Sequence, residues 1–244
     1  MKKKSIVMLA ATVMTTASVA IGGTLAYLTS VDSLKNTFSM GGEGGDGDFS
    51  INLTETGLTT NGEWNATNNT YEWSIADGAQ IDEGQTYNNV LPNSVLPKNP
   101  IVTNTGDFKL WARIQVTIPY DANYYTDVFG TTDADEVADA LLTSANVGSG
   151  ANQFTRTAEI VDGNLVVSYL YNSVLGLGEF TPSAFEEVNI PNLTNEQLDT
   201  LAEANGEGGY DFDLPVSAQA IQTDSGYDTV GEAFVAYDGI GTTA

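Results

Sequence analysis

Alternating apolar and polar residues predict several β-strands along this chain. The clearest case is the stretch 110–118, in which every second residue is apolar. Successive side chains of a strand point to opposite faces, so this spacing predicts a half-buried strand with two different faces. Arg113, Gln115 and Thr117 share the polar face. The apolar face carries Leu110, Ala112, Ile114, Val116 and Ile118.

Shorter stretches predict further strands. The sequence Asp162-Gly163-Asn164 separates two of them and is typical of a tight β-hairpin turn. The predicted strands cover residues 49–53, 70–75, 101–104, 159–161, 165–171, 188–190 and 212–222.

The remaining segments predict turns and short helices. Residues 59–69 are expected to form a turn region, 77–84 a loop, and 86–97 an extended segment with prolines. Helices are predicted at 132–144, where Asp133 is the expected N-cap, at 194–206, and from Thr229 onward. About eight strands and three short helices predict a mainly β fold, a jelly-roll-like β-sandwich with short helices in the connections.

The first residues have the three parts of a secretory signal peptide. Lys2, Lys3 and Lys4 precede an uncharged apolar stretch at 6–23, and a small residue, Ala26, ends the pattern. We expect cleavage by a signal peptidase between Ala26 and Tyr27. The alternative is a retained transmembrane anchor over residues 5–28, which is long enough to span a bilayer.

We expect three parts in the chain: a signal peptide at 1–26, a mature N-terminal segment with its linker at 27–48, and one β-sandwich domain at 49–244. The mature N-terminal segment mixes polar residues with apolar ones. It is followed by a glycine-rich stretch at 41–47, which favours a flexible hinge. Its apolar residues include Tyr27, Leu28, Val31, Leu34 and Phe38.

Charge and composition exclude several classes of function. The chain has 244 residues and a formal net charge of −24; without the three lysines of the signal, five basic residues remain against 32 acidic ones, a net charge of −27. Such a surface repels phosphate backbones and anionic headgroups, so we expect no nucleic-acid partner and, after cleavage, no membrane partner. The absence of cysteine and histidine excludes disulfides, Ser-His-Asp and Cys-His nucleophile systems, and His-based zinc sites.

Several acidic residues are candidates for other chemistry. Asp46 and Asp48 carry oxygen ligands suited to Ca²⁺, although a solvated glycine-rich linker is the better explanation of them. Asp133 and its acidic neighbours fit a helix N-terminus better than a cation site. Glu186-Glu187 with Asp211 and Asp213 would be the acidic pairs of a hydrolase.

Aromatic and lysine side chains give two further candidates. Tyr120, Tyr124, Tyr125 and Phe129, with Trp64 and Trp73 upstream, could stack on sugars or pack in the core. Lys98 or Lys109 could form an internal isopeptide bond with an asparagine. No cofactor is expected.

Three segments together resemble the TasA/camelysin family of Gram-positive secreted proteins, which a SipW-type signal peptidase processes. They are residues 22–40 around the cleavage site, residues 96–116 with Val102-Thr-Asn-Thr-Gly106, and residues 216–234. The matched stretches cover roughly a third of the chain. The chain departs from TasA by having few lysines and by Asn/Thr-rich insertions around residues 57–69.

The resemblance implies a sandwich exported to the cell surface. TasA-type members form biofilm-matrix fibres in which the N-terminal segment of one subunit completes a sheet of the next, and residues 27–40 match that donor segment. We therefore expect a structural surface or matrix protein that self-associates by donor-strand exchange. The alternatives are a monomeric module that binds glycans or proteins, and a secreted hydrolase. Camelysin is described as a metallopeptidase, but a histidine-free chain offers no matching ligands, so we assign no enzyme activity.

Overall fold

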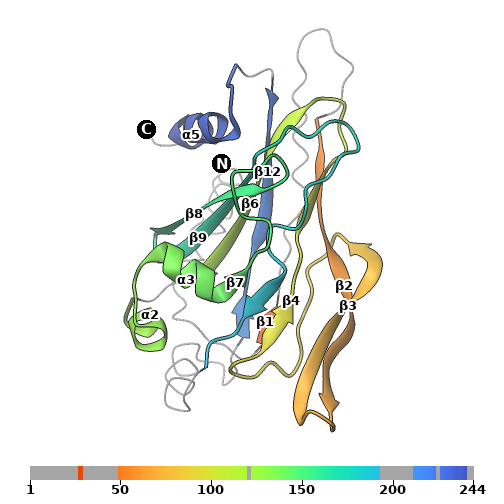
Figure 1. Ribbon diagram of the computed structural model, residues 1–244, viewed down its shortest axis with the longest axis vertical. Helices are drawn as coiled ribbons and strands as arrows, with labels where there is room; N and C mark the ends of the chain where they lie inside the picture. The colour runs from red at the N-terminus through yellow and green to blue at the C-terminus, as the bar shows by residue number, and fades with distance from the viewer. Residues whose placement is uncertain (1–26, 30–48, 120–121, 193–210, 224–225, 241–244) are drawn as a thin grey trace, which may run out of the picture.

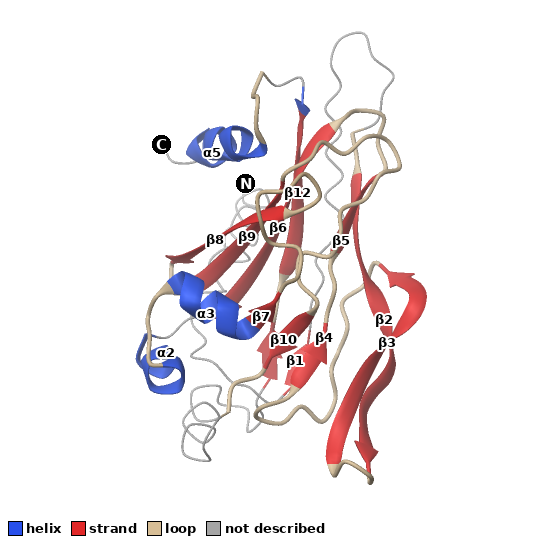
Figure 2. Ribbon diagram, viewed as in Figure 1, coloured by secondary structure: helices blue, strands red, loops and turns tan. Residues whose placement is uncertain are grey.

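The computed structural model describes residues 27–29, 49–119, 122–192, 211–223 and 226–240. Strands dominate these residues, with three short helices beside them (Figures 1 and 2). The helices are α2 (Ala122–Phe129), α3 (Ala134–Leu141) and α5 (Val230–Ile240). The strands are β1 (Tyr27–Thr29), β2 (Ile51–Asn65), β3 (Thr70–Ile81), β4 (Val95–Pro97), β5 (Ile101–Asn104), β6 (Leu110–Pro119), β7 (Leu142–Thr143), β8 (Phe154–Val161), β9 (Asn164–Tyr171), β10 (Glu187–Asn189), β11 (Asp211–Asp213) and β12 (Val216–Gln222).

The central layer is an antiparallel sheet of four strands in the order β12-β6-β9-β8. The strand predicted at 110–118 is β6, and its five predicted apolar residues are all buried. The hairpin predicted around Asp162 and Gly163 joins β8 to β9, and both residues have the positive φ angles that such a turn requires. The alternation and the turn signal are confirmed.

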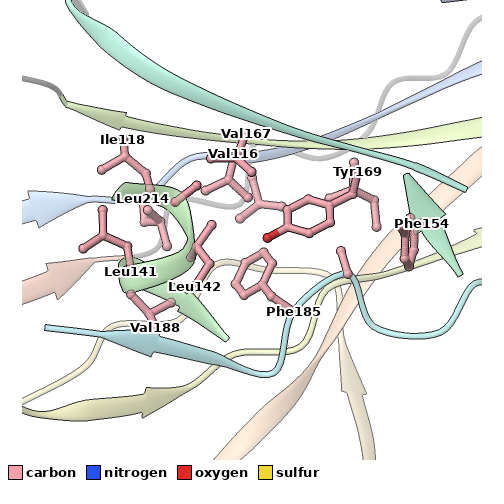
Figure 3. Packing of buried hydrophobic residues seen from close by; sticks show 14 of the residues in the cluster. Val116, Ile118, Leu141, Leu142, Phe154, Val167, Tyr169, Phe185, Val188 and Leu214 are labelled. Carbon is pink, nitrogen blue, oxygen red and sulfur yellow. The ribbon is translucent and has the colours of Figure 1, made fainter. Parts of the chain in front are cut away.

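The second layer contains the sheet β4-β10-β7 and the sheet β3-β2-β5. Between the layers lies one continuous core (Figure 3). Tyr169 of β9 and Phe185 meet there with their ring centroids 5.9 Å apart, and Val188 of β10 and Leu142 of β7 approach from the second layer. The expected mainly β sandwich with short helices in its connections is confirmed.

The opposite face of the central sheet carries a small second cluster under α5, formed by Trp111, Leu170, Val230, Ala233 and Phe234. Arg113, predicted on the polar face of β6, holds this helix. Its guanidinium lies 4.4 Å from the ring centre of Phe234 and donates to both carboxylate oxygens of Asp238. Arg113, on the outer face of β6, thus holds helix α5 against the sheet.

Two predicted loops are strands in the structure. The predicted turn region 59–69 belongs mostly to β2, with the turn itself confined to residues 66–69, and the predicted loop 77–84 starts inside β3. The two strands form one long hairpin that extends away from the sandwich (Figures 1 and 2). Asn, Thr and Gly suggest turns locally, but the register shifts of this hairpin absorb them as bulges.

The helices and the last predicted strand differ in smaller ways. Asp133 caps α3 as predicted, accepting hydrogen bonds from the backbone N–H groups of Asp135 and Glu136. Helix α2 was not predicted, and the helix predicted at 194–206 lies outside the described residues. The strand predicted at 212–222 is divided into β11 and β12 at Leu214-Pro215, because proline has no N–H to donate to a ladder.

Candidate functional site

The predicted cleavage and assembly residues are only partly described. Tyr27 and Leu28 belong to β1, which pairs in parallel with β11, with Tyr27 opposite Asp211 and Leu28 opposite Phe212. The residue after the predicted cleavage site therefore begins a strand, and this strand has a partner in its own chain. The other predicted residues, Ala26, Val31, Leu34 and Phe38, lie outside the described residues.

The predicted cation candidates do not form a described site. Asp46 and Asp48 lie outside the described residues. Asp135 and Asp139, near the cap of α3, both form ion pairs with Arg156. Among the residues that the structure describes, no cluster of three or more acidic, His or Cys side chains could hold a metal ion.

Of the acidic residues considered for a hydrolase, Glu186 has a structural role. Oε1 of Glu186 accepts hydrogen bonds from Asn146 and Ser183, and Oε2 accepts one from the backbone N–H of Ala145. Glu186 therefore fixes the loop after β7. The side chains of Asp211 and Asp213 lie outside the described residues.

The aromatic residues grouped in the sequence analysis lie in separate parts of the structure. Tyr125 of α2 is buried and stacks on Phe129 with 5.6 Å between ring centroids, which confirms core packing for these two. Trp64 and Trp73 lie instead on the β2–β3 hairpin. Trp64 is 53% exposed and contacts Tyr71 edge-on at 5.2 Å, so an accessible pair of aromatic side chains lies on the hairpin.

A cleft of about 450 Å³ lies beside these hairpin aromatics. One wall is β3, the outer strand of its sheet, and the other is the chain that leads into β4. The lining is mostly polar, with two aromatic rings among hydroxyl and amide groups. Its residues are Thr60, Thr70, Tyr71, Glu72, Trp73, Ser74, Leu91, Pro92, Asn93, Ser94 and Val95.

Hydrogen bonds hold the two walls together. The indole N–H of Trp73 donates to the carbonyl of Asn88, and the backbone N–H of Asn88 donates to Oδ1 of Asn61. Asn89 Nδ2 donates to the carbonyl of Gly62. Farther along, the backbone N–H of Asn93 donates to the carbonyl of Pro191, which ties this wall to the segment after β10. The cleft is therefore built into the fold, a property typical of binding sites.

The cleft carries one acidic side chain and no basic one. Oε1 of Glu72 accepts hydrogen bonds from the side-chain amides of Asn65 and Asn68, both of the hairpin end. Sequence reasoning named Trp64 and Trp73 but not this cleft. The alternation of Tyr71 and Trp73 along one strand was the available signal, whereas nothing in the sequence indicated that residues 91–95 would face them.

A buried ion pair lies at the base of the hairpin. Lys98, considered in the sequence for an isopeptide bond with an asparagine, places its Nζ atom 2.5 Å from Oε2 of Glu55 in β2. The hydroxyl of Tyr87 donates to the carbonyl of Pro97 beside it. Burial raises the pKa of Tyr87 above its usual value, and the charge of Glu55 adds to this shift.

Fold and site together define a mainly β sandwich with a parallel N-terminal strand and a polar, aromatic cleft beside a long hairpin. No family model, curated protein or solved structure matches this chain. None of the helices in the described ranges has the length and apolar content needed to cross a bilayer.

Proposed function

We propose that this protein is a secreted structural subunit of the cell surface or biofilm matrix, and that it self-associates by exchange of its N-terminal strand. One observation carries the proposal. The first residue after the predicted cleavage site, Tyr27, is also the first residue of β1, and β1 pairs with β11. Signal-peptide removal would then free the end of a pairing strand.

The pairing of β1 is suited to exchange. Backbone hydrogen bonds form it, so the same bonds can form with a second copy of the chain. It is also short, and β1 and β11 form a two-stranded sheet of their own among the described strands. Isolated two-stranded pairs are marginally stable, which lowers the cost of opening one. Contacts that pass head to tail and do not close produce filaments.

The charge of the mature chain sets a condition on assembly. Subunits with a net charge of −27 repel one another, and added salt screens this repulsion. We therefore expect assembly to increase with ionic strength. A divalent cation that acts only by screening should give the same assembly as monovalent salt of matched ionic strength.

Deletion of residues 27–40 tests whether this segment drives assembly. The mature protein, residues 27–244, and the deletion variant are compared by electron microscopy and light scattering over a range of protein and salt concentrations. We expect filaments or oligomers only from the protein that retains the segment. Equal assembly of both proteins, or monomers from both under all conditions, would overturn the proposal.

Cysteine mixing tests exchange directly, because the chain has no cysteine of its own. Leu28→Cys and Phe212→Cys are made in separate chains, mixed and oxidised. Adjacent strands lie about 4.8 Å apart, which is within disulfide range, so exchange should yield a disulfide-linked heterodimer.

The matched control replaces Phe212→Cys with Val235→Cys on α5, which is 74% exposed but outside the β1 register. It should give only background crosslinking. A Leu28→Cys/Phe212→Cys double variant that closes its disulfide within one chain, together with no heterodimer from the mixture, would show a strand that stays with its own chain and would refute exchange.

A further inference from the structure

The cleft between β3 and residues 91–95 combines two kinds of groups that sugars use. Tyr71 and Trp73 supply aromatic rings, which pack against the C–H faces of pyranose rings. Hydroxyl and amide groups around them can exchange hydrogen bonds with sugar hydroxyls. These polar groups come from the facing wall, from Asn93 and Ser94, because the polar residues of β3 alternate with Tyr71 and Trp73 and point to its other face.

The volume and rigidity of the cleft fit a small ligand. Its volume of about 450 Å³ lies within the range typical of small-molecule sites. The backbone N–H of Leu91 donates to Oγ of Ser94, and the backbone N–H of Ser94 donates back to the carbonyl of Leu91. One wall is thus fixed within itself as well as to the hairpin. A preformed site avoids the entropic cost of ordering its loops on binding.

Charge restricts the ligand to a neutral one. The lining contains the carboxylate of Glu72 and no lysine or arginine, and the chain as a whole has a net charge of −24. An anionic ligand would meet repulsion at the cleft and at a distance. A neutral sugar meets no such repulsion.

We propose that this cleft binds a neutral saccharide, with Tyr71 and Trp73 as its aromatic platform. Trp64, opposite Tyr71 in the hairpin register and half-exposed, extends the aromatic surface toward the hairpin end. The site uses no residue of β1 or β11, so it is independent of strand exchange. A subunit carrying it would bind neutral matrix polysaccharide whether or not it polymerises.

Isothermal titration calorimetry of the mature protein tests the inference with four neutral hexasaccharides: maltohexaose, cellohexaose, xylohexaose and N-acetylchitohexaose. A heparin hexasaccharide serves as the anionic control. We expect saturable binding of at least one neutral sugar with one site per chain, and no binding of heparin. Failure of all four neutral sugars at millimolar concentration, or equal binding of heparin, would overturn the proposal.

Substitutions in the cleft test whether the sugar binds there. Tyr71→Ala should weaken binding about tenfold, the usual effect of losing one aromatic contact. Tyr237→Ala, which removes an exposed tyrosine from α5, is the matched control and should leave binding unchanged. Asn93→Gly removes the lining amide of the facing wall and keeps a residue suited to the positive φ angle there, and it remains informative if Tyr71→Ala does not fold.

Unchanged sugar affinity in both cleft variants would place the binding elsewhere and refute the assignment. A synthetic peptide of residues 27–40 is titrated in parallel, because β3 is an outer strand that could pair with an extended peptide. Binding of this peptide in place of every sugar would also overturn the saccharide proposal, and would assign the cleft to self-assembly. Sugar binding and polymerisation are measured on different variants, so a negative result for one proposal does not affect the other.

Discussion

Nζ of Lys98 lies 2.5 Å from Oε2 of Glu55, and both side chains are only 2% exposed. Glu55 belongs to β2, whereas Lys98 follows β4, so the pair joins the base of the long hairpin to the neighbouring sheet of the same layer. Desolvation of two charges is costly, and their mutual attraction offsets this cost only while both are present. The pair therefore fixes where the hairpin leaves the sandwich.

Removal of one partner of this ion pair should destabilise the protein strongly. Lys98→Met leaves the carboxylate of Glu55 buried without its cation, and we expect a loss of about 3–5 kcal/mol in the free energy of unfolding. Lys109→Met removes an exposed lysine and should change it by less than about 0.5 kcal/mol. Urea unfolding followed by tryptophan fluorescence measures both.

A double variant separates charge from packing. Lys98→Met/Glu55→Leu removes both charges and should recover most of the stability lost in Lys98→Met, because apolar residues often replace a buried ion pair without loss. If Lys98→Met were as stable as Lys109→Met, the pair would have no structural role. An equally unstable double variant would show that shape, and not charge, matters at this place.

The hydroxyl groups of two buried tyrosines should contribute differently to the free energy of unfolding at neutral pH. The hydroxyl of Tyr87 donates to the carbonyl of Pro97, whereas that of Tyr169 has no hydrogen-bond partner among the described residues. Tyr87→Phe should therefore cost about 1–2 kcal/mol, and Tyr169→Phe should cost nothing or stabilise. Chemical unfolding at neutral pH measures this contrast, and equal losses in both variants would contradict it.

The same tyrosines should make the protein sensitive to alkali. Burial raises the pKa of Tyr87 and of Tyr169 above their ordinary value. Because the folded state holds these protons more tightly, their contribution is complete below the unfolded pKa of about 10 and is lost as the pH rises above it. Either Phe variant should lose stability less steeply than the wild type above this pH. Parallel curves for all three proteins in alkaline urea titrations would refute the assignment.

The parts of the fold that the sequence predicted depend on local signals. The alternation in β6, the turn at Asp162-Gly163 and the cap at Asp133 are all set by neighbours in the chain, and all three are confirmed. Helix α2 was missed although an aspartate, Asp121, directly precedes it in the sequence, because its first turn lacks the acidic residues that follow Asp133 in α3.

The long hairpin and the cleft depend on distant contacts, which explains why they were missed. Glu55 and Lys98 are 43 positions apart, and Trp73 meets the carbonyl of Asn88 across the gap between two elements. Strand propensity is also weak where Thr, Asn and Gly predominate, so β2 persists through residues 59–65 only because β3 pairs with it. A single sequence does not encode such pairings in a readable pattern.

Two phenylalanines near each other in the sequence provide a matched test of the core. Phe185 is fully buried against Tyr169 between the layers (Figure 3). Phe180, by contrast, is 66% exposed. Phe185→Ala should lower the free energy of unfolding by about 3–5 kcal/mol through the cavity it leaves. Phe180→Ala should change it by about 0.5 kcal/mol or less. Guanidinium unfolding measures both, and similar losses would mean that Phe180 is buried in an assembly or that the layers pack differently.

Alanine substitutions at two glycines distinguish the effect of backbone strain from that of a steric clash at the cleft. Gly62 and Gly163 have φ angles of +68° and +76°, a region that other residues adopt at a cost, so alanine should strain both by about 1 kcal/mol. A Cβ atom at Gly163 meets nothing within 4 Å, whereas one at Gly62 would lie 2.1 Å from the carbonyl oxygen of Asn88. Gly62→Ala must therefore also displace the segment that holds the cleft wall.

We expect Gly62→Ala to be clearly less stable than Gly163→Ala in urea unfolding. Hydrogen exchange should rise at the backbone amide of Asn88 in Gly62→Ala alone, because displacement of this segment opens the bond from that N–H group to Oδ1 of Asn61. If the two variants lost equal stability and exchange at Asn88 stayed unchanged, the close approach of this segment to the hairpin would be wrong. The cleft would then lack the rigid wall on which saccharide binding depends.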